Sequence, residues 1–507
     1  MKFKLKNLAA LIFSGTLLAV SGCSDFLDEK DPSNLTAENY FTRPEHADAA
    51  VVAIYDNLRF LNGGTGIFAQ NWQMLEALTG TSATETGQNQ DLNNLLALSY
   101  NAENLFIRQW WNALYRGIAN ANLAIANIPA IQMDDVAKNK FLGQAQFLRA
   151  LYYFWLVRLY GDVPLITKPV NATSPELYPT RATQQAVYDL IVSDLTAAEN
   201  SGLAWTDNTG RVSMGAVKSL LSSVYLTMAG FPLNKGTEYY QKAADKSKEV
   251  IDSKLFRTFQ NYDSLHLRGS ENFREHIFMI QYAAGIIDGP FQGLMLPNFK
   301  NISAYSDEIG TTVPTVSFFN SYEATDVRKA EQQFFYTSYY DGGNGGVKVL
   351  GKPYIFKHFD KEAHGTSGVK GTAISGLNWP LIRYAEVLLT FAEAQNEISG
   401  PTTATEDAIN KIRARAGLSA ITGLSKDQFR EAVWKERWYE LCFEGKTWFD
   451  MVRTRKVFNE STKGFDNFVG HAFSYGPALQ QRHLLLPLPR AEMLNNPNLT
   501  PQNDGWE

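Results

Sequence analysis

The sequence predicts a mainly α fold: a scaffold of helix pairs interrupted by one long, loop-rich insert that contains minor strands. Apolar residues recur at helical spacing on both sides of this insert, and capping signatures precede several of the periodic segments. Between residues 256 and 378, short aromatic or β-branched runs alternate with Gly, Asn, Asp and Pro, and periodicity is poor. That texture is typical of loops with small strands.

The first 22 residues are typical of a secretory signal peptide. Lys2, Lys4 and Lys6 precede an uncharged run from Leu8 to Val20, which is shorter than the roughly 20 apolar residues that a membrane-spanning helix needs. The sequence Val20-Ser21-Gly22-Cys23 then resembles the bacterial lipobox, in which the cysteine thiol takes a diacylglycerol and becomes the mature N-terminus. We therefore expect lipidation at Cys23. The alternative is a free cysteine that happens to follow a signal peptide.

A polar, acidic tether is expected over residues 23–40, between the lipid and the body of the protein. The formal net charge of −5 includes the three lysines of the signal peptide, so the mature chain is more acidic still. Nucleic acid is therefore not expected as a partner, since a basic stripe would be needed to bind it. Acylation of Cys23 would leave Cys442 without a partner, so no intrachain disulfide is predicted.

Helical periodicity predicts a first helix from Thr42 to Leu58, beginning with the capping box Thr42-x-x-Glu45 and with Pro44 in its first turn. Further capping boxes, Thr403-x-x-Glu406 and Ser425-x-x-Gln428, precede two later helices. The remaining helices are expected at residues 103–128, 136–160, 183–200, 213–228, 237–252, 381–397, 403–416 and 425–452.

Three regions follow from this pattern. Residues 41–255 form an N-terminal helical region, residues 256–380 form the loop-rich insert, and residues 381–507 form a C-terminal helical region. We expect residues 41–507 to fold as one compact unit. The segment from Phe147 to Tyr160 is apolar almost all round, which predicts a buried central helix.

Five sequence blocks are more specific than periodicity. They are QAQFLRALYYFWLVRLYGDVPLIT (144–167), RYAEVLLTFAEAQNE (383–397), INKIRARAGL (409–418), KERWYELCFEGKTWFDMVR (435–453) and LLLPLPRAEMLNNPNLTPQNDGW (484–506). In this order, behind a lipobox cysteine, they resemble the SusD/RagB family of Bacteroidota. The acidic stretch after Cys23 also resembles a surface-export signal of lipoproteins from that phylum.

The resemblance implies more than the residues show by themselves. Family members are lipid-anchored proteins exposed on the surface of the outer membrane, and they have a tetratricopeptide-like scaffold. They cover a SusC-type TonB-dependent transporter and deliver glycans to it, while some members handle peptides. The 34-residue tetratricopeptide period is not legible in this sequence, so the repeat architecture follows from the resemblance alone.

Motifs of catalysis are not apparent. Glu436, Glu440 and Glu444 are spaced to share one helix face, but basic residues are interleaved with them, which favours a salt-bridged helix over a pair of glycosidase carboxylates. The seven histidines form no HExxH motif, and neither a G-x-S-x-G elbow nor a phosphate loop is present. We expect no enzyme activity, cofactor or metal site. A lipid-anchored hydrolase is the least favoured alternative.

Glycan binding instead needs aromatic faces beside amides and carboxylates. Trp72 lies in the polar, glycine-containing stretch from Ala69 to Asp91, and further aromatic residues of the insert lie among Gly, Asn, Asp and Gln. Ordinary core packing is the competing interpretation for each aromatic residue. The candidate ligand-binding residues are Trp72, Asp91, Tyr100, Asn101, Tyr282, Phe291, Tyr305, Tyr336 and Tyr339.

Other tryptophans belong to blocks of the resemblance that form the scaffold, and we predict core positions for Trp110, Trp111, Trp434, Trp438 and Trp448. Trp379 fits either interpretation. The predicted function is capture of oligosaccharide or polysaccharide and its delivery to a SusC-type transporter. The same scaffold binding peptides or another nutrient is the alternative.

Overall fold

The computed structural model describes residues 40–297, 310–341, 346–361 and 375–507 of the chain. The predicted signal peptide, Cys23, most of the tether and Tyr305 lie outside these ranges. Within them, helices dominate and the strands are short, which confirms the predicted fold class.

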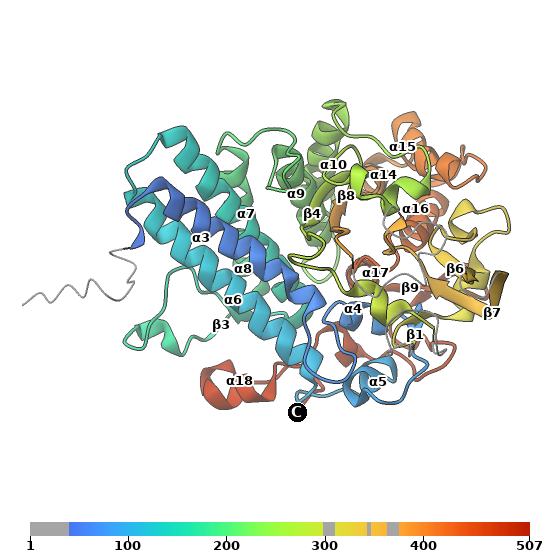
Figure 1. Ribbon diagram of the computed structural model, residues 1–507, viewed down its shortest axis with the longest axis horizontal. Helices are drawn as coiled ribbons and strands as arrows, with labels where there is room; N and C mark the ends of the chain where they lie inside the picture. Colours follow the sequence, from blue (N-terminus) through green and yellow to red (C-terminus); the bar gives the residue numbers. More distant parts are fainter. Residues whose placement is uncertain (1–39, 298–309, 342–345, 362–374) are drawn as a thin grey trace, which may run out of the picture.

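Antiparallel helices form one end of the molecule (Figure 1). α3 (Pro44–Asn57) packs against α6 (Leu105–Asn127) and α7 (Asp135–Tyr160), and α7 packs in turn against α8 (Gln184–Glu199). α6 and α7, which are joined by a short connection, also pack against each other, as is usual for consecutive helices.

A second set of helices continues this arrangement. α9 (Met214–Ala229) packs against α10 (Thr237–Asp252), and α10 contacts α14 (Tyr384–Ser399) although the insert separates them in sequence. α14 then packs against α15 (Thr403–Arg415) and α16 (Lys426–Glu440). The insert thus leaves the helical stack after α10, and the chain rejoins the stack at α14.

The α7 helix is the centre of the N-terminal set. Every residue from Phe147 to Tyr160 is buried except Arg158, which confirms the predicted buried helix. The hydroxyl of Tyr160 donates a hydrogen bond to the backbone oxygen of Ile107 in α6, over 2.6 Å. Gly161 ends the helix with a φ of +74°, a conformation that glycine adopts without strain.

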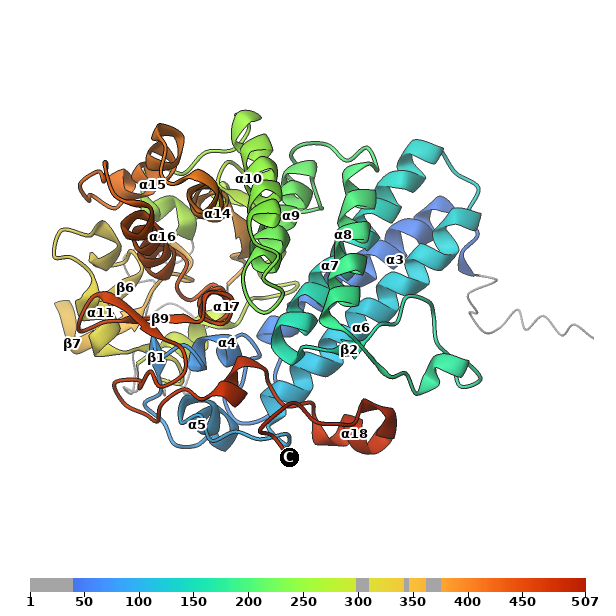
Figure 2. The same cartoon turned by 180° about the vertical axis from the view of Figure 1, so that it is seen from behind.

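The strands pair two by two. Among the described residues there are five two-stranded antiparallel sheets: β1 (Ser82–Ala83) with β5 (Val313–Pro314), β2 (Val163–Pro164) with β3 (Arg181–Ala182), β4 (His276–Ile280) with β8 (Trp379–Arg383), β6 (Phe335–Asp341) with β7 (Gly346–Ile355), and β9 (Lys456–Asn459) with β10 (Gly464–Asn467). The β6–β7 hairpin lies at the end of the molecule opposite α3 (Figure 2).

Short helices complete the described chain, and several of them interrupt segments predicted as loop. They are α4 (Gln73–Ala77), α5 (Gln90–Leu96), α11 (Val316–Ser321), α17 (Thr447–Thr454) and α18 (Arg490–Asn495). The predicted continuous helix over 425–452 is wrong, because α16 ends at Glu440 and α17 starts at Thr447. Phe443, between them, has a φ of +59°, which a continuing helix does not allow.

The predicted capping boxes have mixed outcomes. Ser425 caps α16 in a box with Gln428, as predicted. Thr402, rather than Thr403, caps α15, and its partner is Thr405. At α3 the cap residue is Arg43 and no side chain closes the cap, so the predicted box there is wrong. At α15 the cap lies one residue earlier than predicted, so Thr402 takes the position that was expected for Thr403.

A buried ion network joins the insert to the C-terminal helices. Arg383 pairs with Glu275 over 2.6 Å and with Glu440 over 3.0 Å, and Arg415 pairs with Glu440 over 2.8 Å. Arg328, from the insert, pairs with Glu436 over 2.6 Å. The salt-bridged interpretation of the glutamates is confirmed, but these partners come from other elements rather than from the same helix.

Candidate functional site

An aromatic cluster lies where the insert meets the N-terminal region. It comprises Trp72, Tyr282, Phe291, His358 and Trp379. Trp379 is central: its ring centroid lies 3.9 Å from that of His358, 4.2 Å from that of Phe291 and 5.8 Å from that of Trp72. The Tyr282 ring meets Phe291 edge-on at 5.5 Å. The structure therefore brings together three of the predicted ligand residues.

Five separate segments supply these side chains. Trp72 precedes α4, and its indole N–H donates a 2.7 Å hydrogen bond to the side chain of Gln70. Tyr282 follows β4, and its backbone N–H donates to the side chain of Asn378 over 2.6 Å. Asn378 directly precedes Trp379, the first residue of β8, so the β4–β8 pairing fixes both aromatic rings at one place.

The cluster is part of the core. Trp72 and Trp379 are each 3% exposed, and Tyr282 and Phe291 are also buried. Burial lowers the pKa of His358 to about 4, so the imidazole is neutral at pH 7. Its Nε2 lies 2.6 Å from the backbone oxygen of Phe443 and must therefore carry the proton. With their faces covered by protein, these rings support the surface above them.

Three loops form a surface that we call the loop face: residues 62–70 and 283–290, which adjoin the cluster in sequence, and residues 84–89, which are joined to the first loop. The side chain of Gln70 donates to the backbone oxygen of Pro290, and the side chain of Asn89 donates to that of Ile67, each over 2.9 Å. Gly289 pairs with Ser375 in an antiparallel bridge. Side-chain amides thus join the loops to one another.

The loop face exposes aliphatic and aromatic groups beside polar ones. Ile67 is 56% exposed and Ile286 is 82% exposed. Phe68, the residue after Ile67, has a half-buried ring on a backbone with a φ of +55°. Non-glycine residues rarely adopt this conformation, and such strain is concentrated at functional sites. Phe68 was not among the predicted residues, although an aromatic ring directly after GGTGI is a legible signal.

Three further predicted residues, Tyr100, Tyr336 and Tyr339, pack at other places. Tyr100 is buried against Trp506, with ring centroids 4.9 Å apart. Tyr336 is buried near the β6–β7 hairpin, and its hydroxyl donates to the backbone oxygen of Met295 over 3.0 Å. Tyr339, on the same strand, is 8% exposed. The faces of these rings are covered by protein in this structure.

The polar candidates stabilise the start of α6. Asp91 accepts a hydrogen bond from the backbone N–H of Leu105 over 3.2 Å, and its backbone oxygen accepts from the side chain of Asn104. Asn101 is exposed, and its side chain accepts from the backbone N–H of Glu103. Of the tryptophans predicted as core, Trp434 is half-buried and the other four are buried.

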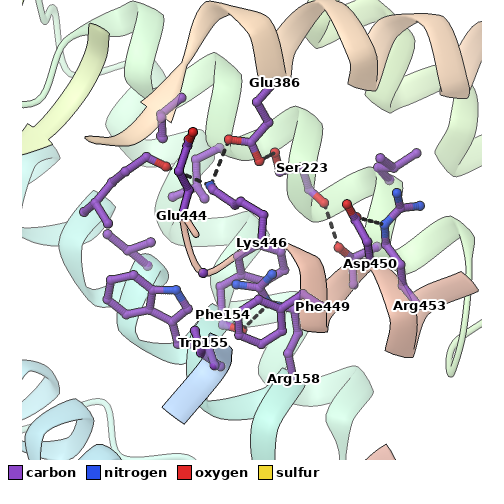
Figure 3. A pocket seen from close by; sticks show the side chains of 18 of the residues that line it. Phe154, Trp155, Arg158, Ser223, Glu386, Glu444, Lys446, Phe449, Asp450 and Arg453 are labelled. Carbon is purple, nitrogen blue, oxygen red and sulfur yellow. Dashed lines mark hydrogen bonds and ion pairs between the residues drawn. The ribbon is translucent and has the colours of Figure 1, made fainter. Parts of the chain in front are cut away.

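A small inner cavity is lined by Trp72 and Trp379 of the cluster, and its volume is about 70 Å³. Figure 3 shows it from close by, with Trp155 and Arg158 among the residues around it. Pockets for organic ligands usually measure about 300–1,000 Å³, whereas one water molecule occupies about 30 Å³ in the liquid. The cavity therefore has room for water but not for a sugar ring.

Charged groups of this cavity are paired or stacked. Lys446 pairs with Glu386 over 2.8 Å, while Arg158 lies between the rings of Phe154 and Phe449, 3.6 Å from each centroid (Figure 3). Among the described residues, no group of three or more His, Cys, Asp or Glu side chains is arranged to hold a metal ion. None of the helices in those parts of the chain is long and apolar enough to cross a bilayer.

Comparison with known proteins decides the family. A crystal structure of a SusD superfamily protein from Parabacteroides distasonis is 38% identical, with a TM-score of 0.86, over 93% of this chain and 100% of that one. The chain belongs to the SusD/RagB family. The SusD family profile matches residues 291–506, and a profile described as starch-binding and associating with the outer membrane matches residues 25–226.

Other relatives agree over nearly the whole chain. SusD-like protein P2 of Formosa agariphila is 28% identical over 98% of this chain and 99% of its own length. A laminarin-binding SusD-like protein shares the fold at 23% identity, with a TM-score of 0.73, and covers 92% of this chain and all of its own. The tetratricopeptide-like scaffold implied by the resemblance is confirmed. Proteins of the SusD family are non-catalytic binding proteins.

Proposed function

We propose that this chain is a surface-exposed lipoprotein of the outer membrane that captures oligosaccharide or polysaccharide and delivers it to a SusC-type TonB-dependent transporter. The loop face is the binding surface. The observation that supports this most directly is its construction: exposed apolar side chains lie on loops that adjoin a buried aromatic cluster and are hydrogen-bonded to it through Gln70. Sugars need such apolar surface for their C–H faces and hydrogen-bonding groups for their hydroxyls.

Rigid support favours binding because less conformational entropy is lost when the ligand is captured. Gln70 connects the aromatic cluster to the loop face, since its side-chain oxygen accepts a hydrogen bond from Trp72 and its side-chain nitrogen donates one to the backbone oxygen of Pro290. Trp72, Tyr282 and Phe291 therefore act in this proposal as supports of the loop face. Phe68 is the ring that contacts the ligand. Family relatives that are described as binding glycan or laminarin support the substrate class.

The sequence and the family support the lipid anchor and the transporter partner of this proposal. Cys23 would hold the lipid, and the acidic tether would connect it to the helical body. A single acyl chain binds membranes only marginally, whereas several chains hold a protein stably. The outer-membrane association in the description of the matching profile supports this placement.

Native affinity electrophoresis tests the capture step. A soluble chain beginning after Cys23 is run through gels that contain one neutral or acidic polysaccharide each. We expect retardation by at least one polysaccharide, and loss of most of it in Phe68→Ala. Tyr178→Ala is the matched control, because Tyr178 is 56% exposed but belongs to the segment between β2 and β3. Retardation by none of the polysaccharides would favour the peptide alternative, tested by binding of peptide mixtures.

A further inference from the structure

A second, much larger cavity lies away from the loop face. Its volume is about 600 Å³, and it is bounded by the end of α7, the start of α8, the end of α17 and the C-terminal segment. None of the five aromatic-cluster residues lines it. The C-terminal segment is fixed there by Asn503, whose side chain donates to the backbone oxygens of Tyr160 and Leu486.

Arginines distinguish this cavity from an ordinary surface cleft. Four half-buried arginines line it without an ion pair to any carboxylate in the described parts of the chain: Arg158, Arg181, Arg455 and Arg482. Each is instead placed by neutral groups. Arg158 is stacked between two phenylalanine rings, Arg455 lies 5.0 Å from the Phe231 ring, and Arg482 lies 4.7 Å from the Trp506 ring.

Opposing charge at the cavity is limited. A fifth arginine, Arg453, is neutralised by Glu393 and Asp450. The two carboxylates that line the cavity are Asp162 and Asp504. Asp162 already accepts a hydrogen bond from the backbone N–H of Gln184, the first residue of α8, over 2.8 Å. Asp504 is exposed to solvent, where its charge is well screened. The cavity therefore has an excess of positive charge.

Arg158 and Arg455 also keep unused donors, whereas the nitrogens of Arg181 all donate, to the backbone oxygens of Asp162 and Pro501 and to the side chain of Asn503. The Nε of Arg158 donates to the backbone oxygen of Phe154, and its two terminal nitrogens have no acceptor among the described residues. Arg455 uses only one terminal nitrogen, which donates to the backbone oxygen of Val452. Burial lowers the pKa of Arg158 to about 9, although the group stays protonated at neutral pH. An anion in the cavity would relieve this unfavourable desolvation.

We propose that this cavity binds a small organic carboxylate of the size of an acidic monosaccharide. Guanidinium groups pair with carboxylates through two parallel hydrogen bonds, a geometry that Arg455 and Arg158 have free donors to make. Amide side chains of Gln184 and Gln502 line the same space and match the hydroxyls of a sugar ring. The volume falls within the range of pockets for organic ligands.

Titration calorimetry with glucuronate, glucose, acetate and sulfate tests this assignment on the whole soluble chain. We expect glucuronate to bind, acetate to compete with it weakly, and glucose to bind at least tenfold more weakly than glucuronate. Arg455→Gln should weaken glucuronate binding at least tenfold. Arg482→Gln provides a second variant if the first is poorly folded, and it should also weaken binding.

The chain offers a closely matched control. Arg274 has a φ of +54° and lies 4.9 Å from the Phe273 ring, just as Arg455 has a φ of +57° and lies 5.0 Å from the Phe231 ring. Arg274 does not line the cavity. Arg274→Gln should therefore leave glucuronate affinity unchanged while sharing any general effect of losing such a residue.

Three outcomes would overturn the proposal. Equal affinity for glucose and glucuronate would remove the role of the carboxylate. Sulfate competing as well as glucuronate would indicate a general oxyanion site. Equal losses in Arg455→Gln and Arg274→Gln would place the effect outside the cavity. None of these results affects capture at the loop face, which Phe68→Ala tests with polysaccharide in a gel.

Discussion

The His358 imidazole stacks on the Trp379 indole, with ring centroids 3.9 Å apart and planes inclined by only 14°. His358 follows β7 and Trp379 begins β8, so this contact joins two separate parts of the insert. The imidazole also bonds to the backbone of Phe443, between α16 and α17. One neutral histidine therefore connects the aromatic cluster to the C-terminal helices.

Acid should weaken this connection. Burial lowers the pKa of His358 to about 4, whereas an unfolded histidine titrates near pH 6.5. The unfolded chain therefore binds the proton first, and the free energy of unfolding falls as the pH drops from about 6.5 to about 4. The slope for this one group is about 1.4 kcal/mol per pH unit.

Urea unfolding between pH 4 and pH 8 measures that slope. His358→Phe keeps an aromatic ring against Trp379 but removes the titrating group. The slope of the unfolding free energy against pH should therefore fall by the contribution of one proton. Above pH 7, the difference in unfolding free energy between the variant and the original protein should not change with pH. An unchanged slope would show that other buried groups, such as His266 and His276, account for the whole acid sensitivity; burial lowers the pKa of each, to about 3 and about 4.

The buried ion network should be sensitive to loss of one partner. Burial alone would raise the pKa of Glu440, but the guanidinium groups of Arg415 and Arg383 lower it to about 2. In Glu440→Gln both arginines would remain buried with one carboxylate fewer, which should cost about 3–5 kcal/mol in the free energy of unfolding. Urea unfolding at pH 7 provides the measurement.

The control for this variant is an exposed pair. Lys248 pairs with Asp252 on the surface of α10, where both side chains are more than half exposed. Asp252→Asn should change the free energy of unfolding by less than about 1 kcal/mol, because solvent screens the pair. A cost for Glu440→Gln that is no larger than this would contradict a structural role for the buried network.

Substitutions of Trp72 and Phe68 should have different effects, because Trp72 supports the loop face whereas Phe68 contacts the ligand. Trp72→Ala removes a buried indole and should cost about 3–5 kcal/mol in the free energy of unfolding. Phe68→Ala removes a half-buried ring from a loop, so the midpoint of thermal unfolding should change little while polysaccharide binding falls. Differential scanning calorimetry beside the affinity gels distinguishes the two. Equal destabilisation of both variants would place Phe68 in the core as well.

Cys23 should determine membrane attachment. In Cys23→Ala the acceptor thiol for the lipid is absent, so the protein should leave the outer-membrane fraction and become soluble. Cys442 is buried and serves as the control residue, and Cys442→Ala should stay membrane-bound. Fractionation of cells with immunodetection compares the two. A Cys23→Ala protein that stays in the outer membrane would exclude the lipid anchor.

Local sequence was sufficient to locate most of the long helices and to predict the central position of α7. Their periodicity is a property of neighbouring residues, and the apolar run from Phe147 to Tyr160 leaves no polar face for solvent. The predicted bounds of α10, residues 237–252, match the structure. Local sequence did not determine where a helix ends within a periodic segment. α16 ends at Glu440, although the periodic pattern continues, because the backbone turns away there in the folded chain.

Exposure of aromatic side chains was decided only by the tertiary structure. Trp72 and Phe68 lie four residues apart in equally polar sequence, yet Trp72 is covered by Trp379, more than three hundred residues further along the chain. Arg328 and Arg383 likewise reach the C-terminal glutamates from other elements. Sequence patterns record which residues can form a helix or bind a sugar. Which ring faces remain open depends on chain segments that meet only on folding.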